Sequence, residues 1–272
     1  MEKRDYKKEF CTLMDKFAFR YSRWQVWNDF LSLSAISLAN AVPTPEKQER
    51  EENYRSIINS YREEEREIFS QMLGIVVLAL EENPEQDFLG SLYHHLELHQ
   101  EQKGQFFTPY HICEFMSEIQ YTDLSADELL RGKRYISVND PACGAGAMLI
   151  AFANVAKKHG INYQKHVLFV AQDIDRTAAM MCYIQMSLLG CPAIGDSLAK
   201  PYPHPDNEVW CTLFYHLNRW RFTTGETGEG QEDGGDMTED GAAAVTLEHL
   251  PENVRIQEGA DGQLMLCIER AS

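Results

Sequence analysis

The sequence predicts a mixed α/β fold, in which an α-helical domain precedes a domain built on a parallel β-sheet. Two observations predict this division. Up to about residue 100, apolar residues recur at the spacing of amphipathic helices. Beyond that point, short apolar or β-branched stretches alternate with helical ones, an order typical of parallel sheets with right-handed crossovers. We place the helical domain at residues 1–100 and the α/β domain at residues 101–272.

In the first domain we expect three helices, at residues 6–40, 46–80 and 87–99. Proline separates the first two helices at Pro43 and ends the second at Pro84. In the second domain the expected elements are helix 110–120, strand 134–139, helix 147–159, strand 166–172, helix 176–189 and strands 192–195 and 264–268.

The composition excludes several classes of protein. The chain of 272 residues is 44% hydrophobic, enough for a core, and no apolar run reaches the ~20 residues that span a bilayer. We therefore expect a cytoplasmic protein with no membrane partner. The seven cysteines include no Cys-x-x-Cys pair, which argues against a disulfide framework or a zinc ribbon.

The charge is strongly acidic, because 42 acidic and 25 basic residues give a net charge of −17. This charge opposes tight, unaided binding to nucleic acid. Seven of the acidic residues lie in the glycine-rich segment 225–241, which has no basic residue and is expected to be a disordered, solvated loop.

A glycine-containing loop follows the first expected strand, where the sequence reads Asp140-Pro-Ala-Cys-Gly-Ala-Gly146. Two glycines let the backbone approach a ligand closely, and the helix start that follows offers free N–H groups. Open α/β sheets bind ligands at this edge. A dinucleotide-binding loop would have a third glycine where this chain has Leu149. Taken alone, Gly144 and Gly146 are read equally well as ordinary turn glycines.

Acidic residues follow three successive expected strands: Asp140, Asp173 and Asp196. Asp140 suits a cationic ligand group, and Asp173 can accept hydrogen bonds from ribose hydroxyls. Asp196 can accept from an adenine amine, although a plain turn residue is an equal interpretation. Together these residues describe a positively charged nucleoside, which S-adenosylmethionine matches better than a phosphorylated nucleotide does. Asp175 is expected to cap the following helix.

Four segments carry a resemblance to a known family: Gly104-Gln-Phe-Phe-Thr-Pro109, Asp140–Gly146, Gln172-Asp-Ile-Asp175 and Gly195-Asp-Ser-Leu198. In this order they resemble the motifs of N6-adenine DNA methyltransferases, and are most similar to those of the methylation subunit of type I restriction-modification systems. The resemblance covers roughly residues 85–200. It implies a Rossmann-like, S-adenosylmethionine-dependent methyltransferase domain that acts on adenine N6 in DNA.

The resemblance also implies which residues bind the cofactor. Those closing over its methionine end would be Phe107, Thr108 and Pro109. Those lining it from the glycine loop would be Asp140, Ala142, Gly144 and Gly146. Asp173 would hold the ribose, and Asp196 with Leu198 would hold the adenine.

One motif of the family is missing. The family places an Asn/Asp-Pro-Pro-Tyr/Phe tetrapeptide after its fourth strand, where it binds the flipped adenine. This chain has no such tetrapeptide, and Tyr202, Trp210 and Tyr215 are its candidates for stacking on a base. The sheet is therefore expected to be truncated. We assign no catalytic residue and no metal ligand. The histidines His94, His95 and His99 are better explained as packed or surface side chains.

Three hypotheses follow from this pattern. The chain is an active DNA methyltransferase with a divergent catalytic loop, reaching DNA through a partner or specificity subunit in a homo- or hetero-oligomer. Alternatively, it is a non-catalytic homologue that binds cofactor or a partner and regulates a restriction-modification system. The third hypothesis is a methyltransferase for a substrate other than DNA.

Overall fold

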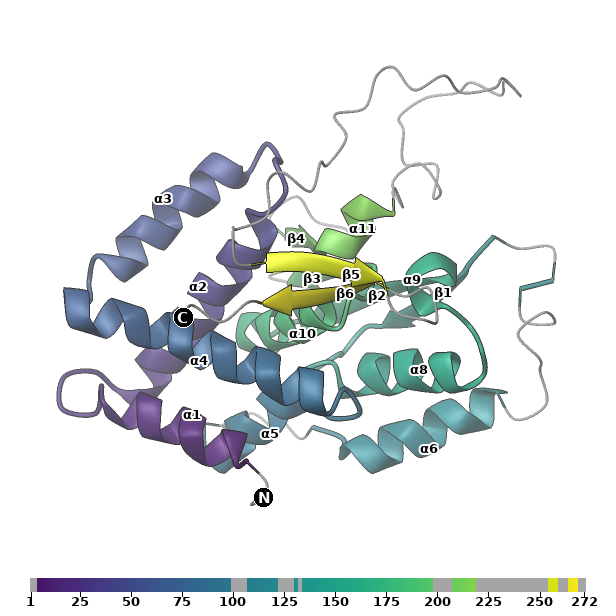
Figure 1. Cartoon of the computed structure of the whole chain (residues 1–272), viewed down its shortest axis with the longest axis horizontal. Coiled ribbons are helices and arrows are strands. Elements are labelled where there is room, and N and C mark those ends of the chain that lie inside the picture. Colours follow the sequence, from purple (N-terminus) through teal and green to yellow (C-terminus); the bar gives the residue numbers. More distant parts are fainter. Residues whose placement is uncertain are drawn as a thin grey trace.

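The computed structural model describes residues 4–98, 107–121, 130–131, 134–197, 207–218, 254–258 and 264–268 (Figure 1). The helices of its N-terminal part are α1 (Tyr6–Asp15), α2 (Arg23–Ala39), α3 (Lys47–Ile58), α4 (Glu63–Glu82) and α5 (Phe88–His95). The elements that follow are α6 (Tyr110–Tyr121), β1 (Ile136–Asp140), α8 (Ala147–Lys158), α9 (Tyr163–His166), β2 (Val167–Asp173), α10 (Arg176–Leu188), β3 (Ala193–Ser197), β4 (Glu208–Cys211), α11 (Leu213–Leu217), β5 (Val254–Glu258) and β6 (Leu264–Ile268).

The central sheet has the strand order β1-β2-β3-β4. The first three strands are parallel, and β4 pairs antiparallel with β3. Helices α8 and α10 make the two crossovers between the parallel strands, as in the first half of a Rossmann-like fold. The predicted α/β fold class is therefore confirmed. Strands β5 and β6 form a separate antiparallel pair, which confirms the strand expected at 264–268.

Strand β1 lies at an edge of the sheet, since among the described strands it pairs with β2 alone. Its residues alternate between half-buried and exposed positions, with Ser137 and Asn139 exposed. In contrast, β2 is buried along most of its length, as its continuously apolar sequence predicts. The carboxyl end of β1, at Asp140, therefore lies on an edge strand of the described sheet.

Helix α10 joins the two parts of the molecule. Its residues Met181 and Ile184 belong to the same apolar core as Phe30 of α2 and Met72 of α4. Its residue Met186 instead packs with the strands and α8. Helix α10 thus contributes to the core of the N-terminal helices and to the separate core of the α/β part, and the boundary at residue 100 remains a prediction.

Two of the expected helices are wrong in their extent. The helix expected at 6–40 is divided into α1 and α2, because the side chain of Ser22 accepts a hydrogen bond from the Gln25 N–H and begins a new helix. The helix expected at 46–80 is divided into α3 and α4, where Glu65 accepts from the backbone N–H of Arg62. Local capping interrupts a continuous apolar pattern in both cases.

The other expected helices and strands are present with small changes of boundary, while α9, β4, α11 and β5 were not predicted. The acidic segment 225–241 lies outside the described residues. Within the described part of the chain, no helix is both long enough and apolar enough to cross a membrane.

Candidate cofactor site

The glycine loop connects the end of β1 to the start of α8. At its beginning, the Asp140 carboxylate accepts a hydrogen bond from the backbone N–H of Ala142 at 3.1 Å. At its end, Gly146 caps α8 with a φ of 97°, a left-handed conformation that favours glycine. The first N–H groups of α8 therefore lie at the carboxyl edge of the sheet, where ligand-binding loops of this kind are expected.

Asp173, the last residue of β2, holds this loop against the sheet. One carboxylate oxygen accepts from the Gly144 N–H at 2.9 Å, and the other accepts from the Asp175 N–H at 2.8 Å. Next to it, the Cys143 N–H donates to the carbonyl of Gln172 at 2.9 Å. Each carboxylate oxygen has two acceptor positions, so Asp173 retains capacity for ligand hydroxyls while it organises the loop.

The two strand-end carboxylates form a negatively charged edge. Burial raises the pKa of Asp140, the N–H of Ala142 opposes this, and the nearby charge of Asp173 raises the pKa further. Two carboxylates held this close favour a positively charged ligand, because a cation relieves their mutual repulsion. The site therefore fits the ammonium and sulfonium groups of S-adenosylmethionine.

Asp175 and Ile174 occupy the turn after β2. The Asp175 carboxylate accepts from the N–H of Thr177 at 2.8 Å and caps α10, which confirms the predicted capping role. Between the two acids, the side chain of Ile174 is 84% exposed. Sequence reasoning missed Ile174, although a single apolar residue between two acids at a strand end was a visible signal. Its exposed position suits contact with a flat apolar ring.

Protein side chains surround the loop glycines closely. A Cβ atom on Gly144, whose φ is 55°, would stand 3.0 Å from the ring of Phe107. A Cβ atom on Gly146 would stand 2.8 Å from the sulfur of Cys182 on α10. Both glycines are therefore required by the turn and by its packing, as in the ordinary-turn interpretation.

Phe107 brings the Phe-Thr-Pro segment to the glycine loop. Its ring stacks on Tyr93 with centroids 5.7 Å apart and meets the edge of His94 at 5.1 Å. Thr108 and Pro109 are exposed at the start of α6. Sequence reasoning missed the role of Tyr93 and His94, which connect α5 to this segment.

Seven of the ten predicted cofactor residues lie on or beside the glycine loop or on the adjoining Phe-Thr-Pro segment. An eighth, Asp173, holds the loop from β2. Asp196 lies in β3, where its backbone is opposite Gln172 of β2, and its side chain lies outside the described residues. Leu198 lies outside them altogether. The adenine-binding half of the prediction therefore remains a prediction.

The aromatic residues considered for base stacking lie elsewhere. Trp210 is buried between the guanidinium of Arg50, 4.5 Å from its ring, and the ring of Tyr183 at 5.4 Å. Tyr215 is buried as well, and Tyr202 lies outside the described residues. Trp210 and Tyr215 are structural side chains, so the suggestion that either stacks on a base is wrong.

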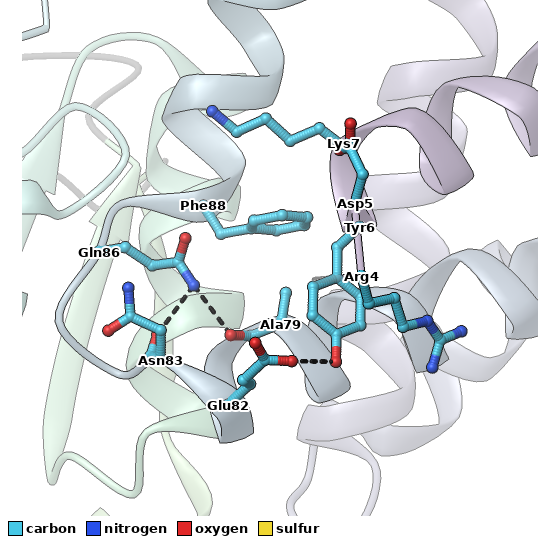
Figure 2. A pocket seen from close by; sticks show the side chains of 9 residues that line it. All are labelled: Arg4, Asp5, Tyr6, Lys7, Ala79, Glu82, Asn83, Gln86 and Phe88. Carbon is cyan, nitrogen blue, oxygen red and sulfur yellow. Dashed lines mark hydrogen bonds between the residues drawn. The ribbon is translucent and has the colours of Figure 1, made fainter. Parts of the chain in front are cut away.

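A cavity of about 320 Å³ lies away from the glycine loop, between the start of α1 and the junction of α4 and α5 (Figure 2). Several of its polar side chains bond to one another or to nearby backbone groups. Tyr6 donates to Glu82 at 2.7 Å, and the Gln86 amide donates to the carbonyls of Ala79 and Asn83. It contains none of the predicted site residues. Among the described residues, no group of three or more His, Cys, Asp or Glu side chains is placed to hold a metal ion.

A parallel sheet with a glycine loop and strand-end carboxylates defines a cofactor-binding α/β domain. Residues 85–209 match the N-6 DNA methylase family model, which confirms the resemblance noted in the sequence.

Among solved structures, a protein from Listeria monocytogenes assigned to the class I S-adenosylmethionine-dependent methyltransferases is similar, at 15% identity and a TM-score of 0.31. The match covers 69% of this chain and 51% of that one, so this chain spans about half of its length. No curated protein matches the sequence.

Proposed function

We propose that this chain binds S-adenosylmethionine at the glycine loop and serves methyl transfer to adenine N6 in DNA, within a restriction-modification system. One observation carries the proposal. Asp140 and Asp173 meet at the carboxyl edge of two parallel strands, against a glycine loop, inside the segment that matches the N-6 DNA methylases.

Each site residue is proposed to contact a different part of the cofactor. Asp140 attracts the cationic methionine end, and Phe107 covers the loop on the side of α5. Asp173 accepts from the ribose hydroxyls, and the exposed Ile174 contacts the adenine ring. The bound cofactor supplies a methyl group on a positively charged sulfur, an electrophile that needs no metal ion.

DNA is proposed to reach the site with the help of a partner subunit. The net charge of −17 leaves the chain without the excess of Lys and Arg that neutralises phosphates. A basic specificity subunit would supply those contacts and the sequence reading.

A second candidate function is a cofactor-binding homologue without catalysis that regulates such a system. The missing tetrapeptide favours it, because this motif binds the target amine in the family that the sequence resembles. The burial of Trp210 and Tyr215 favours it too, because these aromatic rings cannot stack on a flipped base.

Calorimetric titration with S-adenosylmethionine, followed by transfer of a labelled methyl group to duplex DNA, tests both functions. We expect micromolar binding that Asp173→Asn weakens at least about tenfold, the loss of about one charge-assisted hydrogen bond. Asp5→Asn is the matched control, since the Asp5 carboxylate caps α1 by accepting from the Lys8 N–H and is not one of the predicted site residues. Binding with DNA methylation supports the first function, and binding without it supports the second. Absence of binding contradicts both.

A further inference from the structure

Gln185 of α10 is a fully buried polar residue whose amide hydrogen bonds reach two separate parts of the chain. Its amide nitrogen donates to the backbone carbonyl of Ala145, in the middle of the glycine loop, at 2.8 Å. The same nitrogen donates to the carboxylate of Asp87 at 2.8 Å, and the amide oxygen accepts from the Leu89 N–H at 3.0 Å. One side chain thus connects the glycine loop to the start of α5.

The α5 end of this connection is itself well fixed. Asp87 is the N-terminal cap of α5 and accepts from the Gly90 N–H at 2.8 Å. Burial raises the pKa of Asp87, while its hydrogen bonds from Gln185 and Gly90 act in the opposite direction. A buried carboxylate is costly to leave unpaired, so Asp87 holds the Gln185 amide in one orientation.

The glycine loop is therefore held by hydrogen bonds from two different elements, β2 and α10. Asp173 of β2 holds the N–H of Gly144, and Gln185 of α10 holds the carbonyl of the next residue, Ala145. These two bonds fix the N–H of Gly144 and the carbonyl of Ala145, and so the backbone orientation of both residues. Asp173 and Gln185 are 29 and 40 residues away in the sequence from the loop residues that they hold. The conformation of the loop therefore depends on tertiary structure.

We propose that Gln185 is a positioning residue for the cofactor site, through which α5 and the N-terminal helices set the conformation of the glycine loop. This inference rests on the proposed function, because it assigns the loop's fixed shape to cofactor binding. When the loop already has its binding conformation, no binding free energy is lost in ordering it. A substitution that makes the loop more mobile therefore lowers the affinity, even though it removes no group that touches the cofactor.

The test compares Gln185→Met, which keeps the side-chain length and removes every hydrogen bond, with Thr212→Val. Thr212 is the matched control, since it is fully buried and its hydroxyl bonds the backbone of Cys191 and Ala193 at the opposite end of β3. Both variants are expected to lower the melting temperature. Amide hydrogen exchange by mass spectrometry and titration with S-adenosylmethionine are then measured on both.

We expect Gln185→Met to speed exchange across residues 142–147 and to raise the dissociation constant for S-adenosylmethionine at least tenfold. Thr212→Val should leave both quantities within twofold of the wild type. Equal exchange in the loops of the two variants, or an unchanged affinity in Gln185→Met, would overturn the inference.

If Gln185→Met does not fold, amide hydrogen exchange of the wild-type protein can still test the inference. Under increasing denaturant, residues 142–147 and the start of α5 should open in one step with a common free energy, as a single cooperative unit. A loop that opens well before α5 contradicts the inference. If the wild type binds no S-adenosylmethionine, the proposed function fails, whereas the exchange data still decide whether Gln185 positions the loop.

Discussion

Asp140 gives the candidate site a predictable dependence on pH. Burial and the charge of Asp173 raise its pKa, so its carboxylate takes up a proton at a higher pH than an ordinary aspartate does. A cationic ligand needs the ionised form. Affinity for S-adenosylmethionine should therefore fall as pH decreases through the raised pKa of Asp140. For the unliganded protein the sign is opposite, because a raised carboxyl pKa makes the fold lose stability as pH rises through the same range.

The measurement is a series of calorimetric titrations at decreasing pH, on the wild type and on Asp140→Asn. The variant lacks the titrating group, so we expect weaker binding whose pH dependence is shallower. An identical pH profile in both proteins would mean that Asp140 does not face the ligand's charge.

Gly146 is constrained by both its backbone conformation and its neighbour. Gly146→Ala places a methyl group at a φ of 97°, against the Cys182 sulfur at 2.8 Å. We expect the free energy of unfolding to fall by about 2–4 kcal/mol, the sum of left-handed strain and overpacking. Cys182→Ala in the same chain should recover part of the loss, since it removes the sulfur and leaves the strain.

Chemical denaturation of the single and double variants measures this recovery. The control is Gly160→Ala, at a φ of 79° with no atom within 4 Å of the added Cβ, which isolates the strain. A loss in Gly146→Ala no larger than in Gly160→Ala would contradict a contribution from Cys182.

The residues that sequence reasoning found at this site are those with local signals. Asp140 and Asp173 were predictable because each lies at the end of an expected strand, and parallel strands end at one edge of a sheet. Gln185 was not, because its partners Leu89 and Asp87 are 96 and 98 residues away in the sequence. The closeness of Phe107 to Gly144 was implied by family resemblance, whereas the stacking on Tyr93 depends on tertiary packing.

Helix α6 has two different faces. Its inner face packs on α8 through the buried Cys113 and Tyr121. The apolar residues of its outer face are exposed: Ile112, Phe115, Met116 and Ile119. Two acids at its flanks, Glu114 and Glu118, pair with Lys158 and His159 of α8. The helical pattern predicted the helix correctly, but its apolar residues alone could not tell which face is buried.

This arrangement predicts unequal effects of two phenylalanine substitutions. Phe115→Ser, at a position 63% exposed, should change the free energy of unfolding by less than about 0.5 kcal/mol. Phe152→Ala in α8 should lower it by about 3–5 kcal/mol, because it opens a cavity beside Tyr121 and Phe169. Urea denaturation of both variants is the measurement. A large loss in Phe115→Ser would show that its ring is packed in solution.

At the scale of the whole molecule, the apolar core is shared between the N-terminal helices and the α/β part. The sequence indicated a division near residue 100 from its change of pattern, and that change is real at the level of elements. It does not mark a gap in the core, because α10 contributes Ala178, Met181 and Ile184 to the core of the N-terminal helices. Periodicity shows that α10 is apolar all round, but not which element covers each side.

We therefore expect that a chain shortened to residues 85–272 does not fold cooperatively on its own. Removal of α1 to α4 would expose the apolar side of α10 and leave the Gln185 region without the helices that support α5. Loss of near-ultraviolet circular dichroism and binding of a hydrophobic dye should report this. Supplying residues 1–84 as a separate polypeptide should restore the cooperative transition, since the same apolar surfaces would meet again. A sharp thermal transition of 85–272 alone, at the temperature of the full chain, would instead show two independent domains, and the N-terminal helices could then not set the conformation of the glycine loop.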